Sequence, residues 1–302
     1  MTALFLAVSP AAFADEPTTA PAPENPVPSS TLGAPLFDSG KLLATGGVSQ
    51  VEGAGGGGLA SWALINGYGT EHAIGATAHY TYIYLPNYTV HSAGVGVGLY
   101  DRVEFTFARL AFDTRSTGRT LGLGNGFTFH EDVLGAKLKV IGDAVYAQDS
   151  WLPQIAIGTQ YKTNNQAAVI RAIGGKHANG FDFYVAATKI FLAESLLVNA
   201  TIRETKANQF GILGFGGDRN SDYTTQFEGS VVYLLSRDLA IGAEFRTKPD
   251  NLRFAHESNA ADAFISYFFN KHLSGTLAFL QMGDIATQKD QHGLYVSLQT
   301  GL

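Results

Sequence analysis

Apolar and polar residues alternate with a period of two along most of the chain after residue 41. In the last segment, His292 to Leu302, one face carries Leu294, Val296, Leu298 and Leu302, while the residues between them are polar, small or tyrosine. A two-residue period places successive side chains on opposite faces of a β-strand. The pattern therefore predicts a strand with one apolar face at the end of the chain.

Similar segments recur and predict fourteen strands, or twelve if the first two do not belong to the same sheet. They are Leu42 to Glu52, Leu59 to Asn66, His72 to Tyr84, Thr89 to Leu99, Arg102 to Phe112, Val133 to Gly142, Leu152 to Lys162, Phe181 to Phe191, Leu196 to Lys206, Tyr223 to Leu234, Leu239 to Lys248, Asp262 to Phe269, Leu273 to Met282 and His292 to Leu302.

The predicted connections alternate between short and long. Tyr100-Asp101 and Ser236 to Asp238 are short, whereas Thr114 to Asp132 and Ala207 to Asp222 are long. Short turns at one rim and long loops at the other are typical of outer-membrane barrels. Aromatic residues gather near strand ends, as interfacial girdles require: Tyr80, Tyr82, Tyr84, Phe181, Phe183, Tyr267, Phe268 and Phe269. We therefore predict an all-β, membrane-spanning, antiparallel up-and-down β-barrel in the outer membrane of a Gram-negative bacterium.

A sheet in lipid cannot leave an open edge, because each unpaired backbone group costs several kcal/mol there. The last strand, His292 to Leu302, should therefore close the barrel by pairing with Leu42 to Glu52. Its apolar side chains should then face lipid.

The N-terminal part differs from the rest. Met1 to Ala14 is apolar and ends in Ala12-Phe13-Ala14, which predicts a secretory signal peptide. Residues 15–40 are rich in proline and predict a periplasmic linker or, alternatively, a plug in the barrel. The barrel itself is expected over residues 41–302.

The composition agrees with a barrel. Only 15% of the residues are charged, and the chain has 35 Gly, 20 Phe and 13 Tyr, which favours strands and tight turns. A net charge of −6 argues against nucleic acid as a partner. The chain has no Cys, which excludes disulfides and thiolate chemistry.

Charged residues on the inward faces are the candidate functional residues. The expected lumen-lining set is Arg102, Glu104, Lys137, Lys139, Lys162, Asp182, Arg203, Glu228, Glu244, Arg246 and Lys248. Seven basic and four acidic residues would make the lumen mildly positive, which favours anions in a pore. Alternatively, the charges pair across strands, as Lys137 could with Glu104, and fill the lumen.

Motifs with possible chemistry are weak. Gly53 to Gly58 reads GAGGGG but lacks the Lys-Ser/Thr of a phosphate loop, so a tight hairpin or close backbone approach is favoured. His130 to Asp132 is interpreted as a solvated turn rather than a metal site. His91 and Ser92 point to opposite faces of a strand and cannot act together. We therefore predict no catalytic residue, metal or cofactor, and a protein that is not an enzyme.

One long connection contains a helix signal. Asn165 could cap a short helix over Ala167 to Ile173, which Gly174-Gly175 would end. Such a helix could narrow the pore or lie outside it as a lid.

Several segments together resemble a family of Gram-negative outer-membrane β-barrel proteins of unknown function. They are LATGGVSQVEGAGGGGLASWALI at Leu43 to Ile65, Thr188 to Gln209 with its TKANQ, GFGGD at Gly214 to Asp218, KPDNL at Lys248 to Leu252, and NKHLS at Asn270 to Ser274. The resemblance implies a barrel in the membrane, with outer-membrane lipid and the barrel-insertion machinery as partners. It implies no catalytic residue, substrate or cofactor.

Three functions follow as hypotheses. The first is a passive channel for small polar or anionic solutes. The second is a transporter of hydrophobic compounds with an N-terminal plug. The third is a structural barrel with a blocked lumen.

Overall fold

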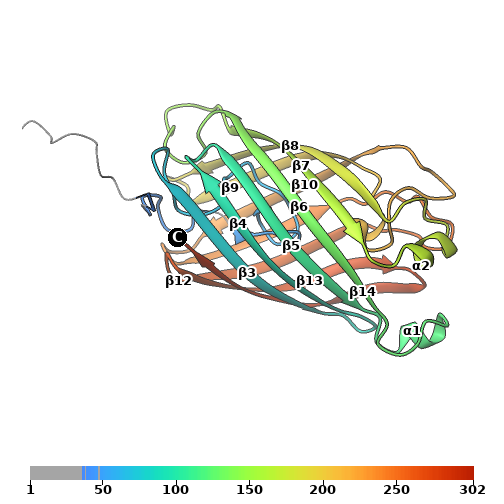
Figure 1. Ribbon diagram of the computed structural model, residues 1–302. Helices are drawn as coiled ribbons and strands as arrows, with labels where there is room; N and C mark the ends of the chain where they lie inside the picture. Colours follow the sequence, from blue (N-terminus) through green and yellow to red (C-terminus); the bar gives the residue numbers. More distant parts are fainter. Residues whose placement is uncertain (1–35, 38, 47) are drawn as a thin grey trace, which may run out of the picture. The chain divides into compact units, whose positions relative to one another are not determined.

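Twelve antiparallel strands, β3 to β14, close into a barrel in the computed structural model, which describes residues 36–37, 39–46 and 48–302 (Figure 1). Consecutive strands pair along the chain, as an up-and-down barrel requires. Their bounds are β3 Ile74–Tyr84, β4 Thr89–Leu99, β5 Val103–Asp113, β6 Thr128–Ile141, β7 Gln154–Asn164, β8 Asn179–Phe191, β9 Leu196–Thr205, β10 Thr224–Leu234, β11 Leu239–Arg246, β12 Ala260–Asn270, β13 Leu273–Ile285 and β14 Gln288–Gly301. The predicted fold class is confirmed. The signal peptide predicted over residues 1–14, and most of the proline-rich segment, lie outside the described residues.

The two faces of the wall differ in polarity. Large apolar side chains point outward and stay exposed, such as Phe105, Leu134 and Val231. Their strand neighbours Glu104 and Ser230 point inward and are buried. An apolar outer face and a polar inner face are what a barrel in lipid needs. The outer face therefore forms the lipid-contacting belt.

The connections also differ between the two rims. At one rim they are short, such as residues 100–102, 192–195, 235–238 and 271–272, with 142–153 somewhat longer. At the other rim the four long loops are residues 114–127, 165–178, 206–223 and 247–259. These loops hold the short helices α1 (Thr117–Thr120), α2 (Ala167–Ala172) and η1 (Asn208–Gly211), and Figure 1 places α1 and α2 together at this end. No helix in the described part of the chain is long and apolar enough to cross a membrane.

Aromatic side chains are exposed at both rims. Tyr84 and Phe181 lie at the long-loop rim, and Tyr267 and Phe269 lie at the short-turn rim. Phe268 differs from the expectation, because it points inward and is buried. The girdles otherwise follow the outward positions of the strands.

The first two predicted strands are not part of the wall. Within Leu42 to Glu52 and Leu59 to Asn66, the structure has only β1 (Val48–Ser49), whose partner is the equally short β2 (Gly55–Gly56). The expected fourteen wall strands are therefore twelve, the smaller number that the pattern allowed. The physical reason is that this segment is rich in glycine and lacks the regular outward row of large apolar residues that a lipid-facing strand needs.

The barrel closes between β14 and β3. The ladder runs from Leu294 opposite Tyr84 to Gly301 opposite Thr77. The prediction that the last strand pairs with Leu42 to Glu52 is therefore wrong, although the last strand does close the barrel. Its apolar side chains are exposed as expected, and Leu298 is 55% exposed.

Candidate functional site: the plugged lumen and its mouth

Residues 48–69, which we call the plug, occupy the barrel lumen. Within this segment, every residue from Ser49 to Gly69 is buried. The plug turns at Gly53, whose φ of +94° favours glycine and whose N–H donates to the carbonyl of Gln50 at 2.8 Å. It ends at the short-turn rim, where the N–H of the buried Tyr68 donates to the Leu302 carbonyl at 2.8 Å.

Wall carboxylates hold the backbone of the plug. Glu104 accepts the Gly55 N–H at 3.0 Å, Glu244 accepts the Leu59 N–H at 2.8 Å, and Glu228 accepts the Ser61 N–H at 2.7 Å. A β-carbon on Gly57 would collide with the Glu244 carboxylate. The GAGGGG segment thus allows a close backbone approach, as expected, and here the approach is to the barrel wall.

Wall cations hold the plug as well. Lys137 donates from Nζ to the carbonyls of Gly55 and Leu64 at 2.8 and 2.9 Å. Near the plug turn, the buried Glu52 pairs with Lys162 and, at 2.7 Å, with Arg246. A buried ion pair is costly to break from one side, because the remaining charge stays desolvated. These contacts hold the plug in the position that the structure shows.

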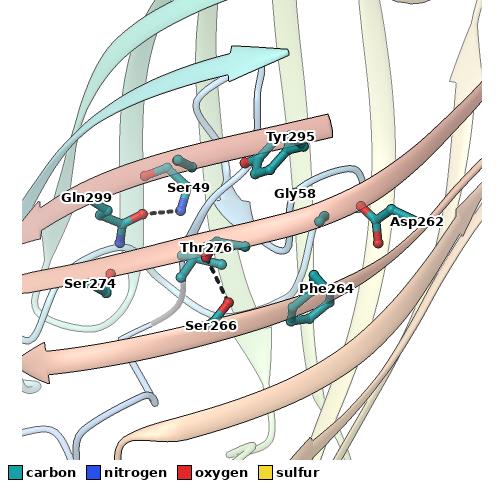
Figure 2. A pocket seen from close by; sticks show the side chains of 12 residues that line it. Ser49, Gly58, Asp262, Phe264, Ser266, Ser274, Thr276, Tyr295 and Gln299 are labelled. Carbon is teal, nitrogen blue, oxygen red and sulfur yellow. Dashed lines mark hydrogen bonds between the residues drawn. The ribbon is translucent and has the colours of Figure 1, made fainter. Parts of the chain in front are cut away.

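Little space remains between the plug and strands β12 to β14. A cavity of about 10 Å³ lies there. Figure 2 shows its lining, with Ser49 and Gly58 of the plug beside Asp262 and Tyr295 of the wall. The Ser49 N–H donates to Oε1 of Gln299 at 2.5 Å across the gap. A volume of 10 Å³ is about the minimum that holds one water molecule. The cavity is therefore too small to pass a solute.

The predicted lumen residues are mostly buried, with two exceptions. Arg102 is exposed in a short turn, and Lys139 is half-buried near the short-turn rim, where it pairs with Asp101 at 2.6 Å. Those inside and buried are Glu104, Lys137, Lys162, Asp182, Arg203, Glu228, Glu244, Arg246 and Lys248.

The expected excess of positive charge does not line the lumen. Three of the seven basic residues do not lie in the wall facing the lumen. Arg102 and Lys139 are at the short-turn rim, and Lys248 lies in the loop after β11, with its Nζ 3.7 Å from Glu257. Lys137 and Glu104 do pair across β5 and β6, at 3.1 Å, as the alternative held. The inward charges are therefore largely balanced by each other and by the plug.

A family described as "Protein of unknown function (DUF3034)" matches residues 45–299. The chain belongs to this family. The match covers the plug and the whole wall apart from the last residues, and it confirms the resemblance noted in the sequence. No curated protein matches the chain.

The chain is similar to several solved outer-membrane barrels. A NanC porin is 10% identical, with 75% of this chain and 100% of that chain covered and a TM-score of 0.49. A KdgM porin is 10% identical, with 74% and 98% covered and a TM-score of 0.48. An outer membrane channel from Pseudomonas putida F1 is 13% identical, with 76% and 94% covered and a TM-score of 0.46. At such identities the likeness says nothing about the solute.

An apolar cavity of about 360 Å³, which we call the mouth cavity, lies at the long-loop rim. Tyr88, Phe112 and Phe129 form one wall, with ring centroids 4.9 and 6.4 Å apart in the two neighbouring pairs. Helix α2 and the residue after it form another wall through Val169 and Ile173. The helix predicted in this loop is confirmed, although Asn165 does not cap it.

A second apolar cavity of about 40 Å³, the inner cavity, lies next to the mouth cavity and reaches the plug at Val51 and Leu59. The turn 208–211 stands between them, and Gln209 and Phe210 adopt left-handed backbone angles there, with φ of 45° and 61°. Such angles cost of order 1 kcal/mol or more for a residue with a side chain. The guanidinium carbon of Arg246 lies 4.1 Å from the centroid of the Phe210 ring. The turn therefore closes the lumen on the side opposite to the short-turn rim.

Other candidate residues have structural roles. Ser92 faces inward and donates to the Val51 carbonyl at 2.6 Å, while His91 faces outward to Tyr80. The expected separation of His91 and Ser92 is thus observed. His130 to Asp132 lies on β6 rather than in a solvated turn, because the alternation of that strand extends further than expected and places Glu131 at an inward, buried position.

Sequence reasoning misses two residues of this site, Glu52 and Phe210. The alternating pattern assigns Glu52 to a wall strand and leaves Phe210 in a loop without a role. A lone carboxylate beside a glycine-rich, otherwise uncharged stretch is the available signal for Glu52. Phe210 has no such signal, because its contacts with Arg246 and Lys248 depend on the fold of the loop.

Proposed function

We propose that the protein is a gated channel of the Gram-negative outer membrane and that the plug is its gate. The observation that carries this proposal is the nature of the plug–wall interface. It combines hydrogen bonds between the glycine-rich backbone of the plug and charged wall residues with the ion pairs of the Glu52 side chain, beside apolar contacts of Leu59 and Trp62. Outer-membrane lipid and the barrel-insertion machinery are the partners that this location implies.

A polar interface of this kind suits reversible opening. When the plug moves away, water can take over the hydrogen bonds of Glu104, Lys137 and Glu244, so those groups remain satisfied. The wall does not depend on the plug for its backbone ladder, since β14 pairs directly with β3. Displacing the plug would therefore leave a closed barrel with a polar lumen.

The test is to lock the plug and to remove it. The chain has no native Cys, and a β-carbon on Gly53 would lie 3.1 Å from that of Ala108 on β5. This is slightly below the usual Cβ–Cβ separation in disulfides of ~3.5–4.5 Å, so a small adjustment suffices. In planar bilayers, we expect the oxidised Gly53→Cys/Ala108→Cys variant to stay closed, and its reduction to restore openings.

Two further variants of the protein complete the test. The Gly53→Cys single variant should be insensitive to oxidant, which controls for the substitution itself, including the strain of a side chain at a positive φ. A chain in which residues 48–64 are replaced by a short Gly-Ser linker should conduct continuously. If that chain conducts no more than the oxidised double variant, the barrel is a structural one and the proposal is wrong.

A further inference from the structure

The mouth cavity is a built feature of the long-loop rim. Six connections meet at this rim: the four long loops and two short turns, residues 85–88 and 286–287. Each of them contributes lining residues to the cavity, which include Tyr88, Leu123, Val169, Leu213, Phe254 and Ala286. These segments are far apart in the sequence and converge only in the folded barrel. Convergence of so many loops on one apolar space is what a ligand pocket requires.

The polar atoms of the lining already have partners. The Tyr88 hydroxyl donates to the Ile285 carbonyl at 3.1 Å, Thr114 Oγ1 donates to the Phe127 carbonyl at 2.7 Å, and Gln209 Nε2 donates to the Asp284 carbonyl at 2.6 Å. None of the described residues that line the cavity is charged. A charged ligand would lose its hydration here without gaining a counter-ion.

We infer that the mouth cavity binds a small, uncharged hydrophobic compound. An engineered apolar cavity of roughly 150 Å³ accepts benzene, so 360 Å³ suits a compound of about bicyclic aromatic size. The three aromatic rings on one wall favour an aromatic ligand, because offset and edge-to-face ring contacts add to the burial of apolar area.

The mouth cavity is also connected to the plug through the inner cavity. The mouth and inner cavities share Phe112, Gln209, Ile212 and Ile285 as lining residues, and the inner cavity ends on the plug. A role of the bound compound in transport rests on the proposed function. The binding site itself does not, because binding can be measured with the plug in place.

The experiment measures equilibrium binding of radiolabelled naphthalene to the full chain in lipid nanodiscs, with empty nanodiscs subtracted. We expect saturable binding at one site per barrel. Val169→Trp should weaken binding at least tenfold by filling the cavity. Arg171→Trp is the matched control, since Arg171 is exposed on the same helix and does not line the cavity, and it should bind as the unaltered protein does.

Leu121→Trp fills the cavity from another loop and serves if Val169→Trp does not fold. Labelled 1-naphthoate, which has the same rings and a negative charge, should bind at least tenfold more weakly than naphthalene. The inference is overturned by the absence of saturable naphthalene binding, by unchanged binding in the filled variants, or by equal affinity for naphthoate. Saturable binding together with a non-conducting plug-replaced barrel would instead refute only the channel.

Discussion

The plug interface and the mouth cavity lie in one barrel and differ in chemistry. The plug interface pairs backbone groups with wall charges such as Glu104 and Lys137, whereas the mouth cavity is lined by aromatic and aliphatic side chains. Water can replace the contacts of the first, but it gains little from filling the second. The difference indicates that one region is suited to open and the other to hold an apolar compound.

The largest effect is expected from removing the charge of Glu52. Glu52→Gln leaves Lys162 and Arg246 without one of their buried partners, which costs the seated plug roughly 3 kcal/mol. The barrel should still form, because its ladder does not involve the plug. Single-channel recording should therefore show a much higher open probability.

The control for this variant is Glu71→Gln. Glu71 follows the plug and is exposed, so removing its charge should leave gating unchanged. Equal open probabilities in the Glu52 variant and the control would show that charge pairing does not hold the plug.

A smaller effect is expected from a single methyl group in the glycine segment. Gly57→Ala places a β-carbon against the Glu244 carboxylate, so this part of the plug must shift and the open probability should rise moderately. Gly58→Ala is a matched control, because its β-carbon would meet its nearest neighbours at an ordinary 3.4 Å. A larger change for Gly58→Ala than for Gly57→Ala would contradict the close-approach explanation.

The smallest effect concerns the turn between the two regions. Burial raises the pKa of Glu257, in the loop after β11, to about 7, although the nearby Lys248 opposes the shift. Glu257 accepts the Gln209 N–H at 2.7 Å, and Asp250 is the other charged group that acts on it. Since the ordinary pKa is 4.5, the closed turn binds the proton more tightly than an open one. Protonation of Glu257 therefore stabilises the closed turn relative to an open one. This contribution is fully present below pH 4.5 and is lost as the pH rises through 7.

Hydrogen exchange of residues 208–214, corrected for the intrinsic rate, measures this effect. Protection should fall several-fold between about pH 5 and about pH 8, and Glu257→Gln should make it nearly independent of pH. Constant protection in the unaltered protein over this range would exclude Glu257 as a pH-sensitive contact of the turn.

Local patterns predict the twelve strands of the barrel wall, although they also offer Leu42 to Glu52 and Leu59 to Asn66 as wall strands. Lipid demands an apolar side chain at every second position, so exposed residues such as Phe105, Leu134 and Leu298 can be assigned from periodicity alone. The pairing of Lys137 with Glu104 is also accessible, because these residues lie opposite each other on consecutive strands. The short helix α2 can also be predicted locally, from the residues of the helix itself and the Gly174-Gly175 pair that follows it.

The contents of the lumen depend on the tertiary structure. Glu52 meets Lys162 and Arg246 across separations of 110 and 194 residues, and no periodic pattern relates such positions. The mouth cavity likewise combines six connections that only barrel closure brings together. The local pattern of residues is enough to specify an apolar-coated barrel, because contact with lipid imposes a repeating requirement along each strand. What fills the barrel and caps it depends on the folded chain, because those contacts join segments that are distant in sequence.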